Sequence, residues 1–92
     1  MRALTRTINK LTAKLLDLPQ DITSDLPRLT MIGNVQLYIE NHRGVLHFSS
    51  ELLGLALSKG RLEVHGKQLV IRAILSEEVF IEGVIDELKY IP

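Results

Sequence analysis

The chain has 92 residues, enough for one small domain with a modest core. Eleven basic and eleven acidic residues cancel, and this balance argues against a main role in binding phosphate backbones. The absence of cysteine excludes disulfides, cysteine-based zinc sites and thiol nucleophiles and favours a reducing compartment, so we expect a cytoplasmic protein. No stretch approaches the roughly 20 apolar residues that a membrane-spanning helix needs.

Residues 1–18 have the pattern of an amphipathic basic helix. Apolar residues at i, i+4, i+7 and i+11 lie on one side of a helix, and basic residues spaced by four form a second stripe. The apolar stripe is Leu4, Ile8, Leu11 and Leu15, and the basic stripe is Arg2, Arg6, Lys10 and Lys14. The Leu18-Pro19 step ends the predicted helix, because proline has no amide to donate and disfavours the α region in the residue before it. Residues 19–28 are predicted to be a linker.

The charge of this arm differs from that of the remaining chain. Four basic residues against Asp17 give residues 1–18 a charge of +3, and seven basic and ten acidic residues give the rest −3. We therefore treat the four basic residues as candidates for interaction. The arm could pack on the rest of the fold, dock into a partner, or lie on an anionic membrane surface.

Residues 29–92 are predicted to form the β domain. Short apolar stretches alternate with turn residues, a pattern typical of antiparallel hairpins. The turn segments are Gly33-Asn34, Arg43-Gly44, Lys59-Gly60, Gly66-Lys67 and Ser76-Glu77-Glu78. We expect a mainly β fold in which about six short strands form a single antiparallel sheet. Its apolar face could be covered by curling into a roll or sandwich, by the N-terminal helix, or by another subunit.

Three local features refine this expectation. The clearest hairpin joins residues 53–57 and 61–65 around Lys59-Gly60. The strand at residues 45–49 has apolar residues on both faces, which indicates a strand covered twice. After Gly83, Val84-Ile85 interrupts the alternation, and a β-bulge at or after Gly83 would restore it.

Groups able to carry chemistry are few. The three histidines, His42, His47 and His65, have none of the close spacings typical of metal sites, so we expect them in turns or on the sheet surface. The acidic pairs Glu77-Glu78 and Asp86-Glu87 lie next to turns or the chain end, where solvated charge is the simpler reading. We expect no enzymatic activity, no cofactor, no metal, no nucleic acid and no small-molecule substrate.

The segment Asn41-His42-Arg43 is predicted to be a turn, because asparagine tolerates the left-handed backbone conformation and Gly44 relieves strain. The alternative is a loop that contacts a partner. We keep Asn41, His42 and Arg43 as candidate interaction residues on that basis.

Several sequence fragments, weak individually, are specific in their order and spacing. They are Leu18-Pro19-Gln20-Asp21, Leu26-Pro27-Arg28-Leu29-Thr30, Ile32-Gly33-Asn34, Ile39-Glu40-Asn41-His42-Arg43-Gly44, the run at residues 60–69 and the run at residues 77–85. With them the chain resembles the YabP/YqfC family of sporulation proteins, the YqfC-like branch most closely. The resemblance implies a role in endospore formation in the mother cell, without enzymatic activity. It also implies a complex with a larger membrane protein at the membrane that surrounds the forespore, and it brings no catalytic residues.

The expected function is therefore a non-catalytic interaction module for spore development. It would use a sheet face, an edge strand or the arm to bind itself or a membrane partner. The alternative is a peripheral membrane-binding protein that acts through its basic N-terminal helix, and an enzyme acting on cell-wall saccharide is disfavoured. We expect a cytoplasmic protein of the mother cell, with a peripheral position at the membrane around the forespore as a further option.

Overall fold

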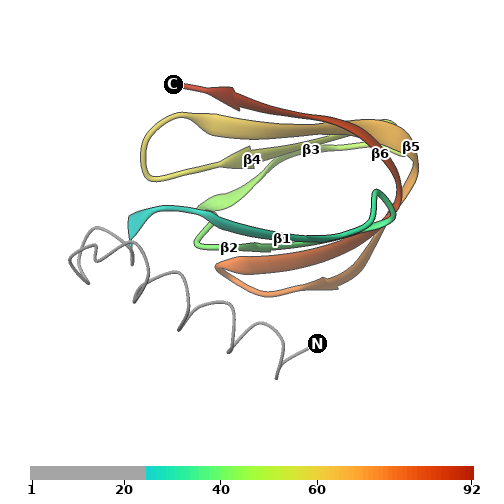
Figure 1. The fold of residues 1–92 in the computed structure, drawn as a ribbon. Helices are drawn as coiled ribbons and strands as arrows, with labels where there is room; N and C mark the ends of the chain where they lie inside the picture. The colour runs from blue at the N-terminus through green and yellow to red at the C-terminus, as the bar shows by residue number, and fades with distance from the viewer. Residues whose placement is uncertain (1–24) are drawn as a thin grey trace.

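The computed structural model describes residues 25–92 (Figure 1). The predicted N-terminal helix, with Arg2, Arg6, Lys10 and Lys14, and most of the predicted linker lie outside the described residues. The described chain forms one six-stranded antiparallel sheet with the strand order β1-β2-β6-β5-β4-β3. The strands are β1 (Arg28–Ile32), β2 (Gln36–Glu40), β3 (Gly44–Phe48), β4 (Leu52–Ala56), β5 (Arg61–Ile74) and β6 (Glu78–Ile91). The prediction of a mainly β fold built on a single antiparallel sheet is confirmed.

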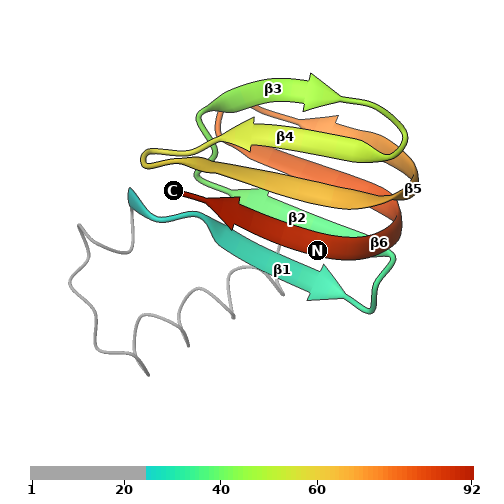
Figure 2. The same cartoon turned by 90° about the horizontal axis from the view of Figure 1, so that it is seen from above.

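The sheet folds over on itself because β5 and β6 run through both of its layers (Figures 1 and 2). β4 pairs with residues 61–65 of β5, whereas β2 pairs with residues 78–82 of β6. One layer therefore contains β1, β2, the second part of β5 and the first part of β6. The other layer contains β3, β4, the first part of β5 and the second part of β6. The sheet does not close, so both layers keep free edges.

β5 and β6 each have 14 residues, so the prediction of uniformly short strands is wrong for this hairpin. The predicted turn at Gly66-Lys67 is a bend inside β5, where pairing to β6 continues through register shifts. Gly66 and Gly83 lie at this bend, and a Cβ atom on Gly83 would approach the Gln68 carbonyl oxygen to 2.7 Å. Asp86 has no partner between the pairs His65–Glu87 and Gly66–Ile85, which confirms the predicted bulge beyond Gly83.

The core lies between the two layers. Buried apolar side chains from β2, β4, β5 and β6 meet there, because alternate residues of a strand point to the same face. They are Leu37, Ile39, Leu53, Leu55, Leu57, Leu62, Val64, Leu69, Val79, Ile81 and Ile85. The predicted hairpin around Lys59-Gly60 is confirmed as the β4–β5 pair.

β3 is an edge strand, so the prediction that it is covered twice is wrong. It pairs only with β4, and Val45, Leu46 and Phe48 are 39%, 60% and 41% exposed. The strand is apolar on both faces although it lies at a free edge of the sheet. An uncovered apolar edge of this kind is unusual in a soluble domain and bears on function.

Candidate interaction surfaces

The segment 41–44 connects the two layers rather than forming a simple hairpin turn, since β2 and β3 are not neighbours in the sheet. Asn41 adopts the left-handed conformation with φ of 68°, as predicted. The His42 amide donates to the Glu77 carbonyl oxygen at 3.2 Å, and the Arg43 amide donates to the Ala56 carbonyl oxygen at 2.7 Å. The backbone of this segment thus joins the β5–β6 turn to the end of β4.

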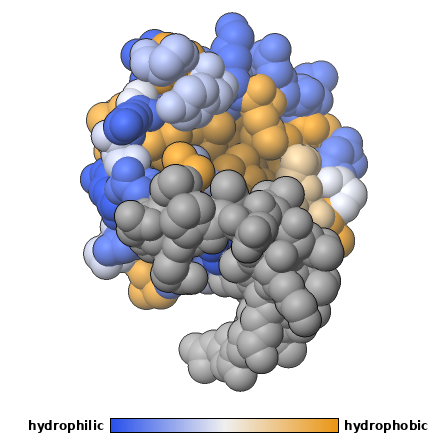
Figure 3. Space-filling view, turned by 60° about the vertical axis from the view of Figure 1, so that its left-hand side comes forward, coloured by the Kyte–Doolittle hydropathy of each residue, from blue (hydrophilic) through white to orange (hydrophobic). Residues whose placement is uncertain are grey.

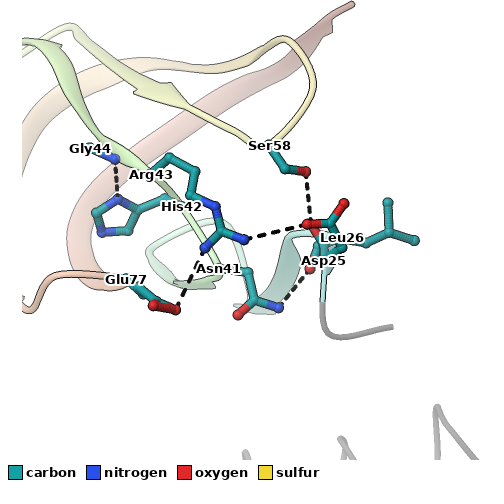
Figure 4. Close-up of polar contacts among 8 residues, drawn as sticks. All are labelled: Asp25, Leu26, Asn41, His42, Arg43, Gly44, Ser58 and Glu77. Atoms are coloured by element: carbon teal, nitrogen blue, oxygen red, sulfur yellow. Dashed lines mark hydrogen bonds and ion pairs between the residues drawn. The ribbon is translucent and has the colours of Figure 1, made fainter. Parts of the chain in front are cut away.

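Side chains of the same segment hold the residues that lead into β1 (Figure 4). The Asn41 amide donates to the Leu26 carbonyl oxygen at 2.8 Å. The Arg43 guanidinium lies between the carboxylates of Asp25 and Glu77, at 3.5 and 3.6 Å, with all three side chains partly exposed. These contacts give residues 41–43 a structural role, because they hold the start of the described chain and the β5–β6 turn against the segment between β2 and β3.

Ser58 also holds the start of the described chain from the β4–β5 turn, where its hydroxyl donates to the Asp25 carbonyl oxygen at 2.9 Å. Sequence reasoning missed Asp25 and Glu77 as partners of residues 41–43, and it missed Ser58 as a partner of Asp25. Each is at least 15 residues away along the chain, so no local pattern could have identified it.

His42 lies in the segment between β2 and β3, as expected, but it is only 2% exposed, a burial that the sequence did not predict. Its Nδ1 atom accepts a hydrogen bond from the Gly44 amide at 3.0 Å, which places the proton of the neutral ring on Nε2. Burial removes the imidazole from any contact surface. Of the three candidates in this segment, Asn41 and Arg43 retain surface positions.

Glu63 of β5 forms ion pairs with His65 and Arg61 of the same strand. His65 Nε2 lies 3.0 Å from a Glu63 carboxylate oxygen, and the pKa of Glu63 is lowered, first by the hydrogen bond from His65 and also by Arg61. Within residues 25–92 no group of three or more side chains is arranged to hold a metal ion. A search of the same part of the chain found no helix of the length and apolar character required to span a bilayer.

On the outer face of the β1–β2 layer, a polar network links three strands. Glu82 of β6 accepts hydrogen bonds from the Gln36 amide at 2.9 Å and from the Arg72 guanidinium. Both contacts lower the pKa of Glu82, with Gln36 the larger cause. Nearby, the rings of Tyr38 and Phe80 lie 6.5 Å apart between centroids, and the Tyr38 hydroxyl donates to Glu78.

The first open surface, which we call the β3 seam, lies between β3 and residues 69–74 of β5. Hydrogen bonds fix both of its ends: the Leu69 amide donates to the Ser50 carbonyl oxygen at 2.8 Å, and the contact between His42 and Glu77 closes the other end. Residues directly opposite each other on paired strands point to the same face. By that rule the partly exposed Val45, Phe48 and Ile74 all point inward, because their partners are the buried Leu55, Leu53 and Val79.

The second surface, the β1 seam, lies between β1 and residues 84–91 of β6, at the margin of the molecule opposite β3 (Figure 2). Here Met31, Leu88 and Tyr90 are inward-facing but 41%, 36% and 56% exposed, opposite the buried Leu37, Val64 and Leu62. Figure 3 shows hydrophobic side chains in the centre of the view, with hydrophilic residues above and to the left of them. The apolar interior therefore reaches the surface along two seams.

Comparison with known proteins gives two consistent results. The model of the YabP family matches residues 25–92, which is the whole described domain. An uncharacterized protein, YqfC of Bacillus subtilis (strain 168), is 49% identical over 76 residues, which cover 83% of this chain and 82% of that protein. Both matches agree with the resemblance carried by the sequence fragments, and the chain therefore belongs to the sporulation-related YabP/YqfC-like family.

Proposed function

We propose that this protein is a non-catalytic interaction module of spore development that assembles with a membrane protein at the membrane around the forespore. Membership of a sporulation-related family supports the biological context. The observation that carries the proposal is the exposure of inward-facing apolar side chains along both seams. Exposed apolar surface of this kind typically marks a protein–protein contact.

The β1 seam is the surface we assign to the membrane partner. β1 is an edge strand, so its outer backbone amides and carbonyls can pair with an added strand. Met31, Leu88 and Tyr90 would supply the apolar contact beneath such a strand. Asp25, held by Ser58 and Arg43, fixes the start of the described domain next to β1.

A pull-down from sporulating cells tests this proposal. The full chain, tagged and expressed in Bacillus subtilis in place of its relative YqfC, should recover a membrane protein. The variant Met31→Lys should reduce recovery at least tenfold, because a buried unpaired charge is costly. Leu46→Lys is the matched control: it adds the same charge at an apolar residue of 60% exposure on β3, the edge strand at the other end of the strand order, and it should leave recovery unchanged. Recovery of soluble metabolic enzymes alone would contradict the proposal.

A second candidate function is peripheral membrane binding through the arm, which the charge of +3 on residues 1–18 favours. Four basic residues contribute about 1 kcal/mol each near an anionic surface, so adhesion would be weak and sensitive to salt. The full chain should co-sediment with anionic vesicles at low salt. Replacing Arg2, Arg6, Lys10 and Lys14 together by glutamine should abolish sedimentation, and unchanged sedimentation would reject this function.

A further inference from the structure

The four free edges of the sheet differ in their charge. Proteins protect free edges with charged side chains, proline or covering segments, because an unpaired strand can recruit another chain. Three of the edges carry charge: β1 has Arg28, the second half of β5 has Arg72, and the second half of β6 has Asp86, Glu87 and Lys89. β3, with the sequence Gly44-Val45-Leu46-His47-Phe48, contains no permanently charged residue and no proline.

Exposure along the same edge is high. Leu46 is 60% exposed and lies at the register shift between Val45 and His47, where a bulge leaves it without a partner on β4. Ile74 and Leu75, at the end of β5 across the β3 seam, are 50% and 63% exposed. The unprotected backbone edge and the apolar side chains thus occur at one place.

We propose that β3 pairs in antiparallel fashion with β3 of a second copy of this chain, about a two-fold axis near Leu46. A two-fold interface brings each strand against itself, so any charge on this short strand would lie close to the same charge on its copy. β3 satisfies this requirement because it carries none. The formal charge of zero also removes long-range repulsion between two copies.

The size of the surface is compatible with such a dimer. A standard interface buries roughly 800 Å² on each partner, about a seventh of the 5900 Å² of surface that the chain exposes. The paired strands would supply backbone hydrogen bonds, and Val45, Phe48 and Leu75 would supply apolar area at the β3 seam. Two six-stranded sheets would then become one continuous sheet. This inference is independent of the proposed membrane partner, which uses the β1 seam.

The lack of cysteine allows a direct test by cross-linking. Opposed residues of an antiparallel pair lie about 4.5–5.5 Å apart between Cα atoms, within the range that a disulfide bridges. The full-chain variant Leu46→Cys should therefore form a covalent dimer under mild oxidation. Val84→Cys, an exposed apolar position away from β3, is the control and should cross-link at least tenfold more slowly. Equal rates for the two variants would overturn the proposal.

The mass in solution gives a second test. Light scattering on the wild-type protein should give twice the chain mass of 10.4 kDa at micromolar concentration. Leu46→Lys places two like charges near the axis and should weaken dimerisation at least tenfold, whereas Val84→Lys should not. Circular dichroism checks that both variants are folded. A monomeric wild-type protein, or a dimer that Leu46→Lys leaves intact, would refute pairing through β3, and the pull-down through the β1 seam would be unaffected.

Discussion

At Gly83 the backbone of β6 passes so close to the backbone of β5 that no side chain fits. A Cβ atom there would lie 2.7 Å from the Gln68 carbonyl oxygen and 2.9 Å from Leu69 Cα, and φ is +144°. Gly33, in the β1–β2 turn, also has a positive φ, of +55°, but a Cβ atom on it would meet nothing within 4 Å. The two glycines therefore separate the effect of backbone conformation from the effect of close approach.

Gly83→Ala should destabilise the domain by at least about 3 kcal/mol, because backbone strain and a steric clash act together. Gly33→Ala should cost only about 1 kcal/mol, since it adds conformational strain alone. Urea unfolding of both variants measures the difference. Equal losses would mean that the backbones of β5 and β6 can move apart at the bend.

Glu82 predicts a pH dependence of stability. Its folded pKa is lowered from the ordinary 4.5 by Gln36 and Arg72. A lowered pKa stabilises the fold above the ordinary value, and that stabilisation is lost as the pH falls through the folded pKa. Glu82→Gln should therefore lose less stability than the wild type when the pH is lowered from neutral to acid.

Urea midpoints measured across that pH range test the prediction. Arg72→Gln should reproduce part of the change, because the hydrogen bond from the Gln36 amide to Glu82 remains. If the stabilities of the wild type and of Glu82→Gln fall equally as the pH is lowered, the Glu82 carboxylate does not contribute to the pH dependence of stability.

Among single residues, the sequence predicted those features that depend on residue type. The left-handed conformation of Asn41 follows from its own side chain and was predictable. The burial of His42 was not, because it depends on the packing of two layers brought together by distant strands. The partners of Arg43 are likewise set by the tertiary fold, since Asp25 and Glu77 lie far from it in the sequence.

At the level of elements, β4 and β3 have similarly apolar sequences but opposite environments. Leu55 of β4 is fully buried in the core, whereas Leu46 of β3 is 60% exposed. Leu55→Ala should cost about 2–5 kcal/mol, because it leaves a cavity. Leu46→Ala should change the free energy of unfolding by less than about 0.5 kcal/mol in dilute solution, where the chains are separate. Thermal or urea unfolding compares the two, and similar losses would mean that β3 is covered.

Periodicity predicted most of the strand segments but not their order in the sheet, and it divided β5 into two strands at Gly66-Lys67. The alternation in β2 and the turn at Lys59-Gly60 identified two elements correctly. Apolar residues on both faces of β3 fit either a doubly covered strand or an unprotected edge, and only the strand order distinguishes them. The dipeptide Gly66-Lys67 likewise fits either a turn between two strands or a bend within one strand. It is a bend, because β5 remains paired with β6 on both sides of it.

For the whole molecule, the sheet order predicts a gradient of local stability. β6 is paired on both sides at its start, with β2 and β5, whereas β1 has one partner only. Backbone hydrogen bonds with partners on both sides open only by larger unfolding events. In native-state hydrogen exchange, amides of residues 78–82 should exchange at least tenfold more slowly than those of β1. Equal protection would indicate that β1 is covered by another segment.

The positions of the candidate interaction surfaces also depend on the fold of the whole sheet. The short chain indicated a marginal core, and the apolar face of the predicted sheet needed a cover, so the sequence suggested self-association or a partner. It could not locate the seams, because they arise where edges of different layers meet. Val45 and Ile74 are 29 residues apart in the sequence, and only the folding of the sheet over itself places them on the same seam.

The shared long hairpin also constrains how the chain reaches its final structure. Four of the five strand pairings join neighbours in sequence, and only β2 with β6 joins distant segments, residues 36–40 with 78–82. Closing that loop costs entropy before its contacts form, so the nucleus for folding should contain β5 and β6, with β2 docking late. Because each layer contains part of both long strands, formation of the β5–β6 hairpin organises both layers at once.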